Sequence, residues 1–426
     1  MILVTHPTGN EFVRNALCAF ADKSLLAEFH TGVSWNPDGV VDRLLPSRFR
    51  AELRRRSFPA SVRPYVRNHP IREAARLLCQ SARWSHPVTH EVGIFSVDAV
   101  FRSLDRTVAR RLVTSAPFSA IYAYEDCAES SFAAAHAAGM STIYDLPIGY
   151  WRAAQKVFEE EAEREPEWAC TLTGRLDSDS KRQRKDSELE QPDGIIVASQ
   201  FTKSTLAEAP RRPESVFVVP YGAPPVAPYE RPLTSARKPL RVMYAGALTQ
   251  RKGLSYFLAA CDTVRNAIEV TILGRRAANK CTPLDEALRK YRYIESLPHR
   301  QLLAEMAQQD VLVFPSLFEG FGLVILEAMA QGVPVITTPS TAGPDLITEA
   351  ESGFIVPTRD SSSIVAHLEL LNSNRQLLRD MAMAARAKAG SSGWGKYRQD
   401  LVAAVLSVIE SKDTPRRTCV AAVPLP

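Results

Sequence analysis

Two glutamates, Glu319 and Glu327, are separated by seven residues and enclose the flexible turn Gly320-Phe321-Gly322. The stretch Leu323–Ala330 has a helical composition, so Glu319 is expected on a loop and Glu327 about one and a half turns into a helix. Ionised carboxylates accept hydrogen bonds from vicinal hydroxyls, and the first N–H groups of the helix favour an anion. The pattern predicts a site in which one glutamate reaches a sugar and the other a ribose. The alternative is that Glu319 caps the helix and Glu327 is solvated.

A basic turn supplies the complementary charge. The apolar run Leu240–Tyr244 leads into GALTQRKG, which contains Gly246, Arg251 and Lys252. The adjacent cations Arg251 and Lys252 suit an anion, although a surface turn at the start of a helix would have the same composition.

Short apolar runs alternate with helical segments along the chain, which indicates parallel sheets covered by helices on both faces. We predict strands at 1–5, 120–124, 142–144, 194–198, 216–219, 240–244, 269–273, 311–314 and 333–337. Proline-rich residues between two groups of these strands indicate a linker. The predicted organisation is a Rossmann-like domain at 1–222, a linker at 223–239, a second Rossmann-like domain at 240–394, a helix at 395–411 and a flexible tail at 412–426.

Bulk properties fit an ordinary globular protein. The net charge of +5 over 426 residues is too small to indicate nucleic acid by itself. The 7 cysteines show no CxxC pair, which favours reduced thiols in a cytoplasmic compartment. We recognise no signal peptide and no apolar stretch of the ~18 residues that cross a bilayer, so a cytoplasmic location is expected.

The segment PSLFEGFGLVILEAMAQGVPVIT, residues 315–337, strongly resembles the E-x7-E motif of retaining glycosyltransferases of family 4, which have the GT-B architecture. Residues 242–260 resemble that family's phosphate-binding strand, loop and helix, and 270–276 resemble its next strand and glycine turn. PYGAP at 220–224 resembles the hinge, and SGW at 392–394 resembles the start of the final helix. The resemblance covers nearly all of the C-terminal half and only the pattern of the N-terminal half.

This resemblance implies an α/β fold of two Rossmann-like domains that face each other across a cleft, with a final helix that crosses back to the first domain. The first domain would bind the acceptor and the second the nucleotide sugar. The implied reaction transfers a sugar, with retention, to the hydroxyl of a sugar, a lipid-linked acceptor or another acceptor in cell-surface glycan or glycolipid synthesis. The departing phosphate would receive the acceptor proton, so no strong protein base is required.

The resemblance also assigns roles to residues. Lys252 would contact the diphosphate with help from Arg251, and Glu319 and Asp145 would lie near the reacting sugar. Gly9 would be the close-approach glycine of the N-terminal loop. The other implied donor-binding residues are Gly246, Gly274, Gly320, Phe321, Gly322, Leu323 and Glu327.

Three departures from the family pattern keep a second class of function open. Ala247 stands where the family often has arginine, Gly9 is flanked by Thr8 and Asn10, and Asp145 replaces a histidine. A non-catalytic member that binds a nucleotide sugar or a partner glycosyltransferase therefore remains an alternative. A phosphorylase or a sucrose or glycogen synthase shares the architecture, but the chain is short for one. An NAD-dependent oxidoreductase is disfavoured because no GxGxxG follows either first strand.

Other polar and aromatic groups have two interpretations each. Asp145 and Glu125 are candidates for acceptor binding or base assistance, and each could equally cap a turn. Tyr150 and Trp151 offer flat surfaces for a sugar ring. No cofactor and no metal are expected, because DSDS at 177–180 lies in a polar insert rather than on a loop between strands.

Two charged segments complete the sequence. Residues 43–76 are dense in arginine interleaved with apolar side chains, and we predict contact with an anionic membrane or a phosphate-bearing acceptor. The alternative is a helical pair with a solvated basic face. Residues 158–191 carry both signs of charge and are interpreted as solvated helices and a loop.

Overall fold

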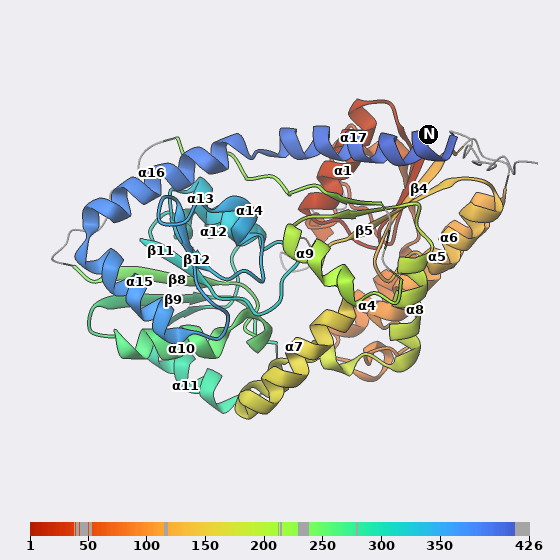
Figure 1. Ribbon diagram of the computed structural model, residues 1–426. Helices are drawn as coiled ribbons and strands as arrows, with labels where there is room; N and C mark the ends of the chain where they lie inside the picture. Colours follow the sequence, from red (N-terminus) through yellow and green to blue (C-terminus); the bar gives the residue numbers. More distant parts are fainter. Residues whose placement is uncertain are drawn as a thin grey trace, which may run out of the picture. The chain divides into compact units, whose positions relative to one another are not determined.

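The computed structural model describes residues 1–37, 39, 42, 50, 53–114, 118–211, 213, 215–228, 238–277 and 280–413 (Figure 1). Its contacts divide the chain into two compact units. Unit 1 comprises residues 1–144, 191–195 and 400–426, and unit 2 comprises residues 145–190 and 196–399. This division follows contacts rather than chain order, so it differs from a cut at the proline-rich linker.

The N-terminal half of the chain forms a seven-stranded sheet of order β3-β2-β1-β4-β5-β6-β7. Strand β1 pairs in parallel with both β2 and β4, and β2 pairs in parallel with β3. Every residue of β1 is buried, as expected for a central strand covered on both faces. The strands are β1 (Ile2–Thr5), β2 (Leu26–Thr31), β3 (Val66–Asn68), β4 (Ala120–Tyr124), β5 (Ser141–Leu146), β6 (Gly194–Val197) and β7 (Val216–Val218).

Helices connect these strands, as the alternating pattern predicts. The side chain of Asn10 accepts a hydrogen bond from the backbone N–H of Val13 and so caps the first helix. The helices are α1 (Glu11–Asp22), α4 (Pro70–Ser81), α5 (Val97–Val113), α6 (Glu129–Ala137), α7 (Trp151–Arg164), α8 (Asp179–Glu190) and α9 (Gln200–Thr205). A 3₁₀ helix, η3 (Pro166–Thr171), follows α7.

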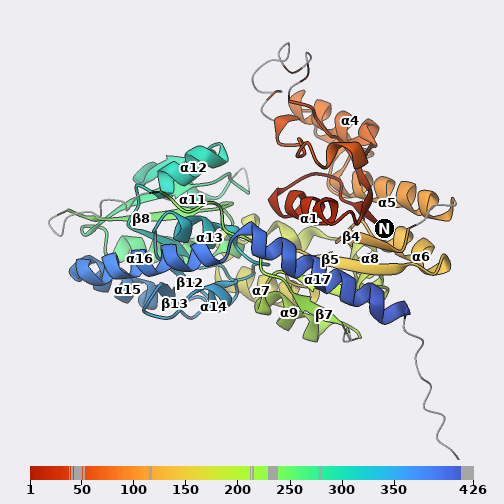
Figure 2. The same ribbon diagram turned by 90° about the horizontal axis from the view of Figure 1, so that it is seen from above.

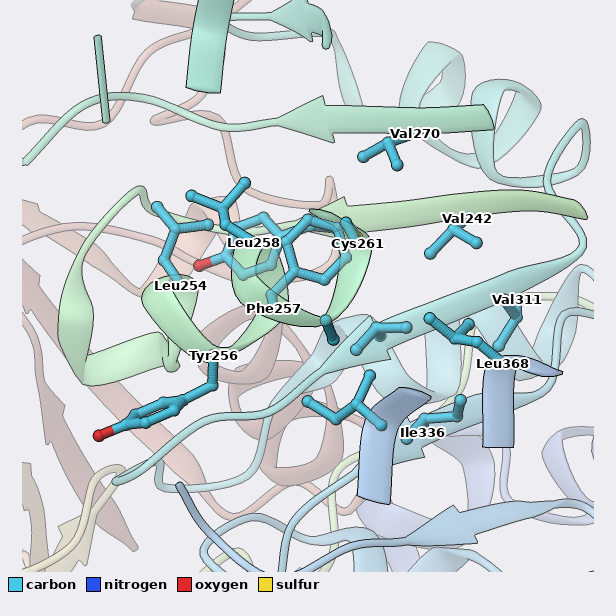
Figure 3. Close-up of a cluster of buried hydrophobic side chains, with 14 of the residues drawn as sticks. Val242, Leu254, Tyr256, Phe257, Leu258, Cys261, Val270, Val311, Ile336 and Leu368 are labelled. Atoms are coloured by element: carbon cyan, nitrogen blue, oxygen red, sulfur yellow. The ribbon is translucent and has the colours of Figure 1, made fainter. Parts of the chain in front are cut away.

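A second, six-stranded sheet lies entirely in unit 2, with all its strand pairs parallel and the order β10-β9-β8-β11-β12-β13. Figure 3 shows Val242, Val270 and Val311 from three neighbouring strands beside Phe257 and Cys261 from the following helix. These buried side chains form the core that holds the sheet and its helices together. The strands are β8 (Leu240–Ala245), β9 (Ile268–Leu273), β10 (Arg292–Ile294), β11 (Val311–Phe314), β12 (Val335–Thr337) and β13 (Gly353–Ile355).

Helices also follow the strands of this second sheet. They are α10 (Leu254–Thr263), α11 (Thr282–Lys290), α12 (His299–Met306), α13 (Leu323–Ala330), α14 (Gly343–Leu346), α15 (Ser361–Ser373) and α16 (Arg375–Ser391). The last helix, α17 (Trp394–Asp413), begins in unit 2 and belongs to unit 1 from Asp400 onward. None of the helices in the described ranges has the length and apolar composition needed to cross a membrane.

Each sheet has a point at which its strand order reverses. In the first sheet this point lies between β1 and β4, and in the second between β8 and β11. Loops that leave neighbouring strands in opposite directions open a crevice at the carboxyl edge of a parallel sheet, where ligands bind. Ligand-binding groups of the second sheet are therefore expected on the loops that follow β8 and β11.

The interpretation of residues 158–191 as solvated helices and a loop needs correction. Within 158–191, Glu161 and Glu188 are fully buried and Trp168 is almost so, because they pack inside the protein rather than face water. Of the basic segment 43–76, residues 43–49 and 51–52 lie outside the described residues. In its described part Phe58 is buried, which makes it a core side chain rather than a membrane contact.

Candidate functional site

The basic turn follows β8 at the reversal point of the second sheet. Thr249 caps a short 3₁₀ helix, η6 (Gln250–Lys252), by accepting from the backbone N–H of Arg251 at 3.4 Å. A Cβ on Gly274, at the end of β9, would lie 1.6 Å from the carbonyl oxygen of Gly246. Only glycine permits that approach, so Gly246 and Gly274 shape the turn through contact with each other.

The acidic loop follows β11 and leads into α13. Gly320 packs so closely that a Cβ there would lie 1.9 Å from the carbonyl oxygen of Pro147, and Thr202 donates to the Gly320 carbonyl at 2.8 Å. Gly322 is the N-cap of α13, with φ of 83°, and Leu323 is its first helical residue. The predicted order of loop, glutamate and helix start is confirmed.

The two loops bring the predicted charged residues together. Lys252 Nζ and Arg251 Nη1 both contact Glu319 Oε2, the arginine at 3.2 Å. Arg251 Nη1 also donates to the carbonyl oxygen of Phe318 at 2.8 Å. The Lys252 ammonium lies 4.7 Å from the centre of the Phe314 ring, within cation–π range.

Burial disfavours the charged forms of the two cations in this cluster. Desolvation lowers the pKa of Lys252 well below its usual range, and the neighbouring Arg251 charge lowers it further. Desolvation also lowers the pKa of Arg251. A buried lysine and a half-buried arginine therefore share one carboxylate, which leaves the cluster complementary to an additional anion.

Glu327 lies on α13 and has a different partner. Its Oε1 is 2.8 Å from His299 Nε2 at the start of α12, and the His299 side chain is about half exposed. The structure thus brings Glu319 to the cations, whereas the contact that it gives Glu327 is with a histidine. His299 carried no recognisable signal in the sequence, because its pairing with Glu327 arises only when α12 packs beside α13.

A buried network behind the basic turn was also absent from the sequence predictions. Gln250 donates through Nε2 to Glu161 Oε1 at 2.6 Å, and its backbone N–H donates to Thr171 Oγ1 at 2.9 Å. Glu161 also accepts from Tyr256 Oη at 2.9 Å and pairs with Arg359 Nε at 2.7 Å. Residues of α7 and η3 thereby fix the segment that immediately precedes Arg251.

Phe321 is fixed by an aromatic cluster. Its ring centre is 5.1 Å from that of Tyr221, which in turn lies 5.7 Å from Tyr397 and 6.2 Å from Trp394. Phe321 is only 2% exposed. It therefore positions the loop, and only its backbone remains a candidate for ligand contact.

The N-terminal candidates have different surroundings. Gly9 lies in the loop after β1, and a Cβ there would approach the Phe58 ring to 2.6 Å, so the close approach is to a protein side chain. Asp145 is buried within β5 instead of following it. Burial, and then the charge of Asp145, raise the pKa values of Tyr221 and Tyr397.

The expectation that Tyr150 offers a surface for a sugar ring is wrong. Tyr150 is 2% exposed, and its hydroxyl donates to Asp186. Trp151 Nε1 donates to the same Asp186 oxygen at 2.7 Å. Both aromatic side chains are held by α8, because the polar residue Asp186 satisfies their donors.

Comparison with known proteins finds similarity to glycosyltransferases. Residues 226–388 match the family described as glycosyl transferases group 1. The D-inositol 3-phosphate glycosyltransferase of Paenarthrobacter aurescens is 28% identical over 187 residues, which cover 41% of this chain and 46% of that protein. The amylovoran biosynthesis glycosyltransferase AmsK of Erwinia amylovora is 29% identical over 164 residues, 35% of this chain and 40% of that protein. The chain spans less than half the length of these relatives.

Solved structures resemble nearly the whole chain. Sucrose-phosphate synthase from Thermosynechococcus elongatus superposes with a TM-score of 0.67 at 16% identity, covering 96% of this chain and 99% of that one. Anabaena HepE in complex with UDP-glucose superposes with a TM-score of 0.59 at 16% identity, over 95% of this chain and 99% of that one. These similarities show the fold, an α/β fold of the GT-B type. The predicted fold class and the resemblance to glycosyltransferases are confirmed.

Proposed function

We propose that the protein is a retaining glycosyltransferase that moves a sugar from a nucleoside diphosphate donor to a hydroxyl acceptor. One observation carries the proposal. Lys252, Arg251 and Glu319 converge at the carboxyl edge of a parallel sheet, at its reversal point, inside the segment that matches glycosyl transferases group 1.

The charge balance supports a diphosphate donor. Lys252 and Arg251 contribute two positive charges in a largely buried setting, and Glu319 offsets one of them. A diphosphate would supply the remaining negative charge. The helix α13 starts directly after Gly322, and its unpaired N–H groups favour an anion at the same edge.

Hydroxyl recognition falls to the two glutamates. Glu319 is held in place by the cations and retains further lone pairs for a sugar hydroxyl. Glu327, oriented by His299, would accept from the vicinal hydroxyls of the ribose. The imidazole contact fixes the carboxylate, which reduces the entropy lost when a ligand binds.

The proposed reaction breaks the bond between the anomeric carbon and the donor phosphate oxygen. Its electron pair stays on the diphosphate, whose growing charge Lys252 and Arg251 stabilise. The acceptor oxygen forms the new bond to the anomeric carbon, and its proton passes to the departing phosphate. Attack on the face from which the phosphate leaves retains the anomeric configuration.

The relatives support a role in polysaccharide synthesis. One of them is named for amylovoran biosynthesis, and others for colanic acid biosynthesis. A structural neighbour was solved with UDP-glucose. We propose by analogy a sugar or lipid-linked acceptor in the synthesis of a cell-surface glycan.

Thermal unfolding with UDP, GDP, ADP or dTDP tests the donor site. A nucleotide at 100 times its dissociation constant should add about 2.7 kcal/mol of stability. Lys252→Ala should lose this effect, whereas Lys388→Ala should keep it, because Lys388 is an exposed lysine on α16. Stabilisation that survives in Lys252→Ala would contradict the site.

A turnover assay separates the two classes of function. The nucleotide sugar selected by the unfolding screen is offered with a panel of hydroxyl acceptors, and the product is analysed for its anomeric configuration. Transfer with retention supports the enzyme. Nucleotide binding without transfer to any acceptor would favour the non-catalytic alternative, and transfer with inversion would contradict the mechanism.

A further inference from the structure

Exposed apolar side chains are unevenly distributed over the described residues. Twelve large apolar side chains are exposed, and seven of them lie between residues 71 and 113, about one-tenth of the chain. Single exposed apolar residues are normal, but a concentration of them marks an interaction surface. The seven are Ile71, Leu78, Trp84, Val92, Ile94, Val97 and Val113.

An arginine pocket lies within the same segment of unit 1. The pocket has a volume of about 290 Å³, and Arg72 from α4 lines it together with Arg102, Arg106 and Arg110 from α5. The three α5 arginines recur every four residues and therefore share one face of the helix. Helices α4 and α5 pack against each other (Figure 2), so both contribute to one surface.

Three of these seven residues have neighbours that place them near this pocket. Ile71 precedes Arg72 in the chain and is 82% exposed. Arg72 Nη1 donates to the carbonyl oxygen of Ile94 at 2.6 Å, which places the exposed Ile94 beside the pocket. Val113 continues the arginine face of α5 by one further turn. We call this combined surface, residues 71–113 of α4, α5 and the segment between them, the α4–α5 face.

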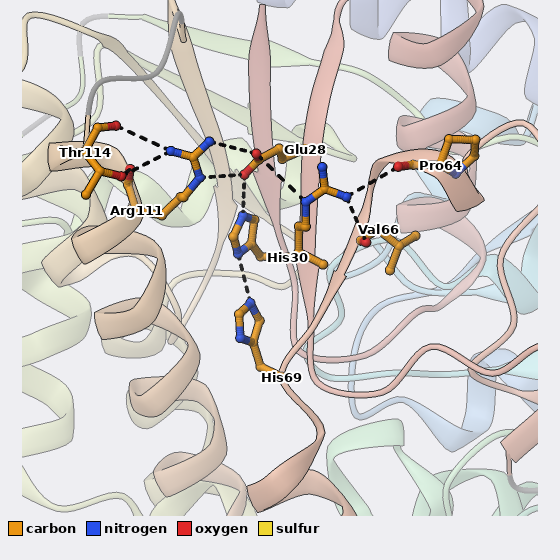
Figure 4. Close-up of polar contacts among 8 residues, drawn as sticks. Glu28, His30, Pro64, Val66, His69, Arg111 and Thr114 are labelled. Carbon is orange, nitrogen blue, oxygen red and sulfur yellow. Dashed lines mark hydrogen bonds and ion pairs between the residues drawn. The ribbon is translucent and has the colours of Figure 1, made fainter.

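The arginines of α5 differ in whether a carboxylate already pairs with them. Arg111 donates to Glu28 through Nε at 3.1 Å and Nη2 at 2.9 Å, and His30 contacts the same carboxylate at 2.9 Å (Figure 4). Burial opposes the charge of Glu28, but these hydrogen bonds outweigh it and lower its pKa. Arg111 is thus used by the fold. Arg106 and Arg110, by contrast, are exposed and have no carboxylate partner within the ranges that the structure describes.

Acidic side chains offset only part of the charge of the α4–α5 face. Its four acidic residues are all buried or half-buried. Glu73 is paired with Arg56 at 2.8 Å and Arg76 at 2.7 Å, and Asp98 lies 3.9 Å from Arg102. The face therefore presents basic and apolar groups together. That combination matches an anionic bilayer, in which apolar side chains enter the interface and guanidinium groups bind lipid phosphates.

We propose that the α4–α5 face docks the protein on an anionic phospholipid bilayer. Arg106 and Arg110 would bind lipid phosphates, while Ile71 and Ile94 insert beside them. This proposal moves the predicted membrane contact from residues 43–76 to residues 71–113. In the earlier segment Arg56 is buried against Glu73 and Arg54 is paired with Asp42, so their charges are already used.

Flotation of the full chain with vesicles tests the proposal. We expect binding to phosphatidylglycerol-containing vesicles at low salt and little binding to pure phosphatidylcholine. Arg106→Gln with Arg110→Gln should weaken binding about 25-fold, since each basic residue near an anionic surface contributes roughly fivefold. The matched control is Arg300→Gln with Arg379→Gln, two exposed arginines of unit 2, which should bind like the wild type.

The apolar half of the surface has its own control. Ile71→Ser with Ile94→Ser should weaken vesicle binding at least tenfold, whereas Leu370→Ser with Met383→Ser, exposed residues of unit 2, should not. Trp84, 65% exposed, should show a blue shift with vesicles that Trp84→Phe removes.

Several results would overturn the proposal. They are no vesicle binding by the wild type, equal binding by both arginine double variants, and a concentration-dependent dimer in light scattering that the isoleucine double variant abolishes. The dimer would assign the face to a second copy of the chain. The vesicle assay contains no nucleotide, so its failure would leave the donor site untouched.

Discussion

Glu161→Gln should show how strongly the buried network supports the donor site. Glu161 is fully buried, accepts hydrogen bonds from Gln250 and Tyr256, and pairs with Arg359 at 2.7 Å. Glutamine keeps the size of the side chain but removes its charge and one acceptor. Gln250 and Tyr256 share Oε1, whereas Arg359 contacts Oε2, so glutamine cannot keep all three contacts, and water cannot replace the one that is lost in this buried site.

The magnitude follows from these contacts. Breaking a buried ion pair costs about 3–5 kcal/mol, and the Arg359 side chain is 20% exposed, which favours the lower end. We expect about 3 kcal/mol. For a unit the size of unit 2 each kcal/mol corresponds to roughly 2–4 °C, so the melting temperature of unit 2 should fall by roughly 6–12 °C.

The neighbouring Glu160 provides a matched control. It contacts the same Arg359 at 3.2 Å, but its side chain is 65% exposed. Glu160→Gln should therefore cost at most about 1 kcal/mol. Both variants are compared by thermal unfolding and by nucleotide titration. Nucleotide affinity should fall about tenfold in Glu161→Gln alone, since the loss of one hydrogen bond loosens the turn that carries Arg251. Equal melting temperatures for the two variants would refute the reasoning.

The remaining predictions concern single groups. Lys252→Ala and Glu319→Ala should each lower turnover at least ~10²-fold in a transfer assay, as expected for one lost preorganised charge contact, and near wild-type turnover would contradict the assignment. Glu327→Gln should raise the nucleotide dissociation constant in calorimetry more than it lowers turnover, because Glu327 is expected to contact the ribose. Burial lowers the pKa of His6 to about 4, so the unfolded state binds more protons than the folded state between pH 6.5 and 4. The free energy of unfolding therefore decreases as the pH falls from 6.5 to 4. The loss should reach roughly 3 kcal/mol at pH 4, and His6→Gln, followed by thermal unfolding against pH, should flatten the curve; equal slopes would exclude His6 as the cause.

Central strands were predictable because they are buried on both faces and appear as uninterrupted apolar runs. Predicted strands 120–124 and 311–314 coincide with β4 and β11. Strand β2 was missed because Glu28 and His30 interrupt its apolar pattern. Those polar groups are tolerated inside the sheet only because Arg111, 83 positions away, pairs with Glu28. No local pattern contains that pairing.

The residues of the candidate site were likewise predictable only in part. Lys252 and Glu319 were predictable because each follows a strand of a recognisable motif, and parallel strands bring their ends to one edge. Glu161 was not, since Gln250 lies 89 positions away and the charged run around Glu161 is typical of a solvated helix. Charge alone does not reveal burial; only the fold identifies which carboxylate is enclosed.

The charge of the site implies how it should discriminate between ligands. Burial and the neighbouring Arg251 both oppose the positive charge of Lys252, and Glu319 is the carboxylate that both cations contact. A diphosphate relieves this imbalance, whereas an uncharged nucleoside does not. The nucleoside of the preferred nucleotide should therefore bind at least ~10²-fold more weakly than the diphosphate, because hydrogen bonds between charged groups contribute about 1.5–3 kcal/mol each. In Lys252→Ala the gap measured by calorimetry should shrink roughly tenfold. If the gap were unchanged, binding would depend on the base and ribose, and the cations after β8 would not be the phosphate site.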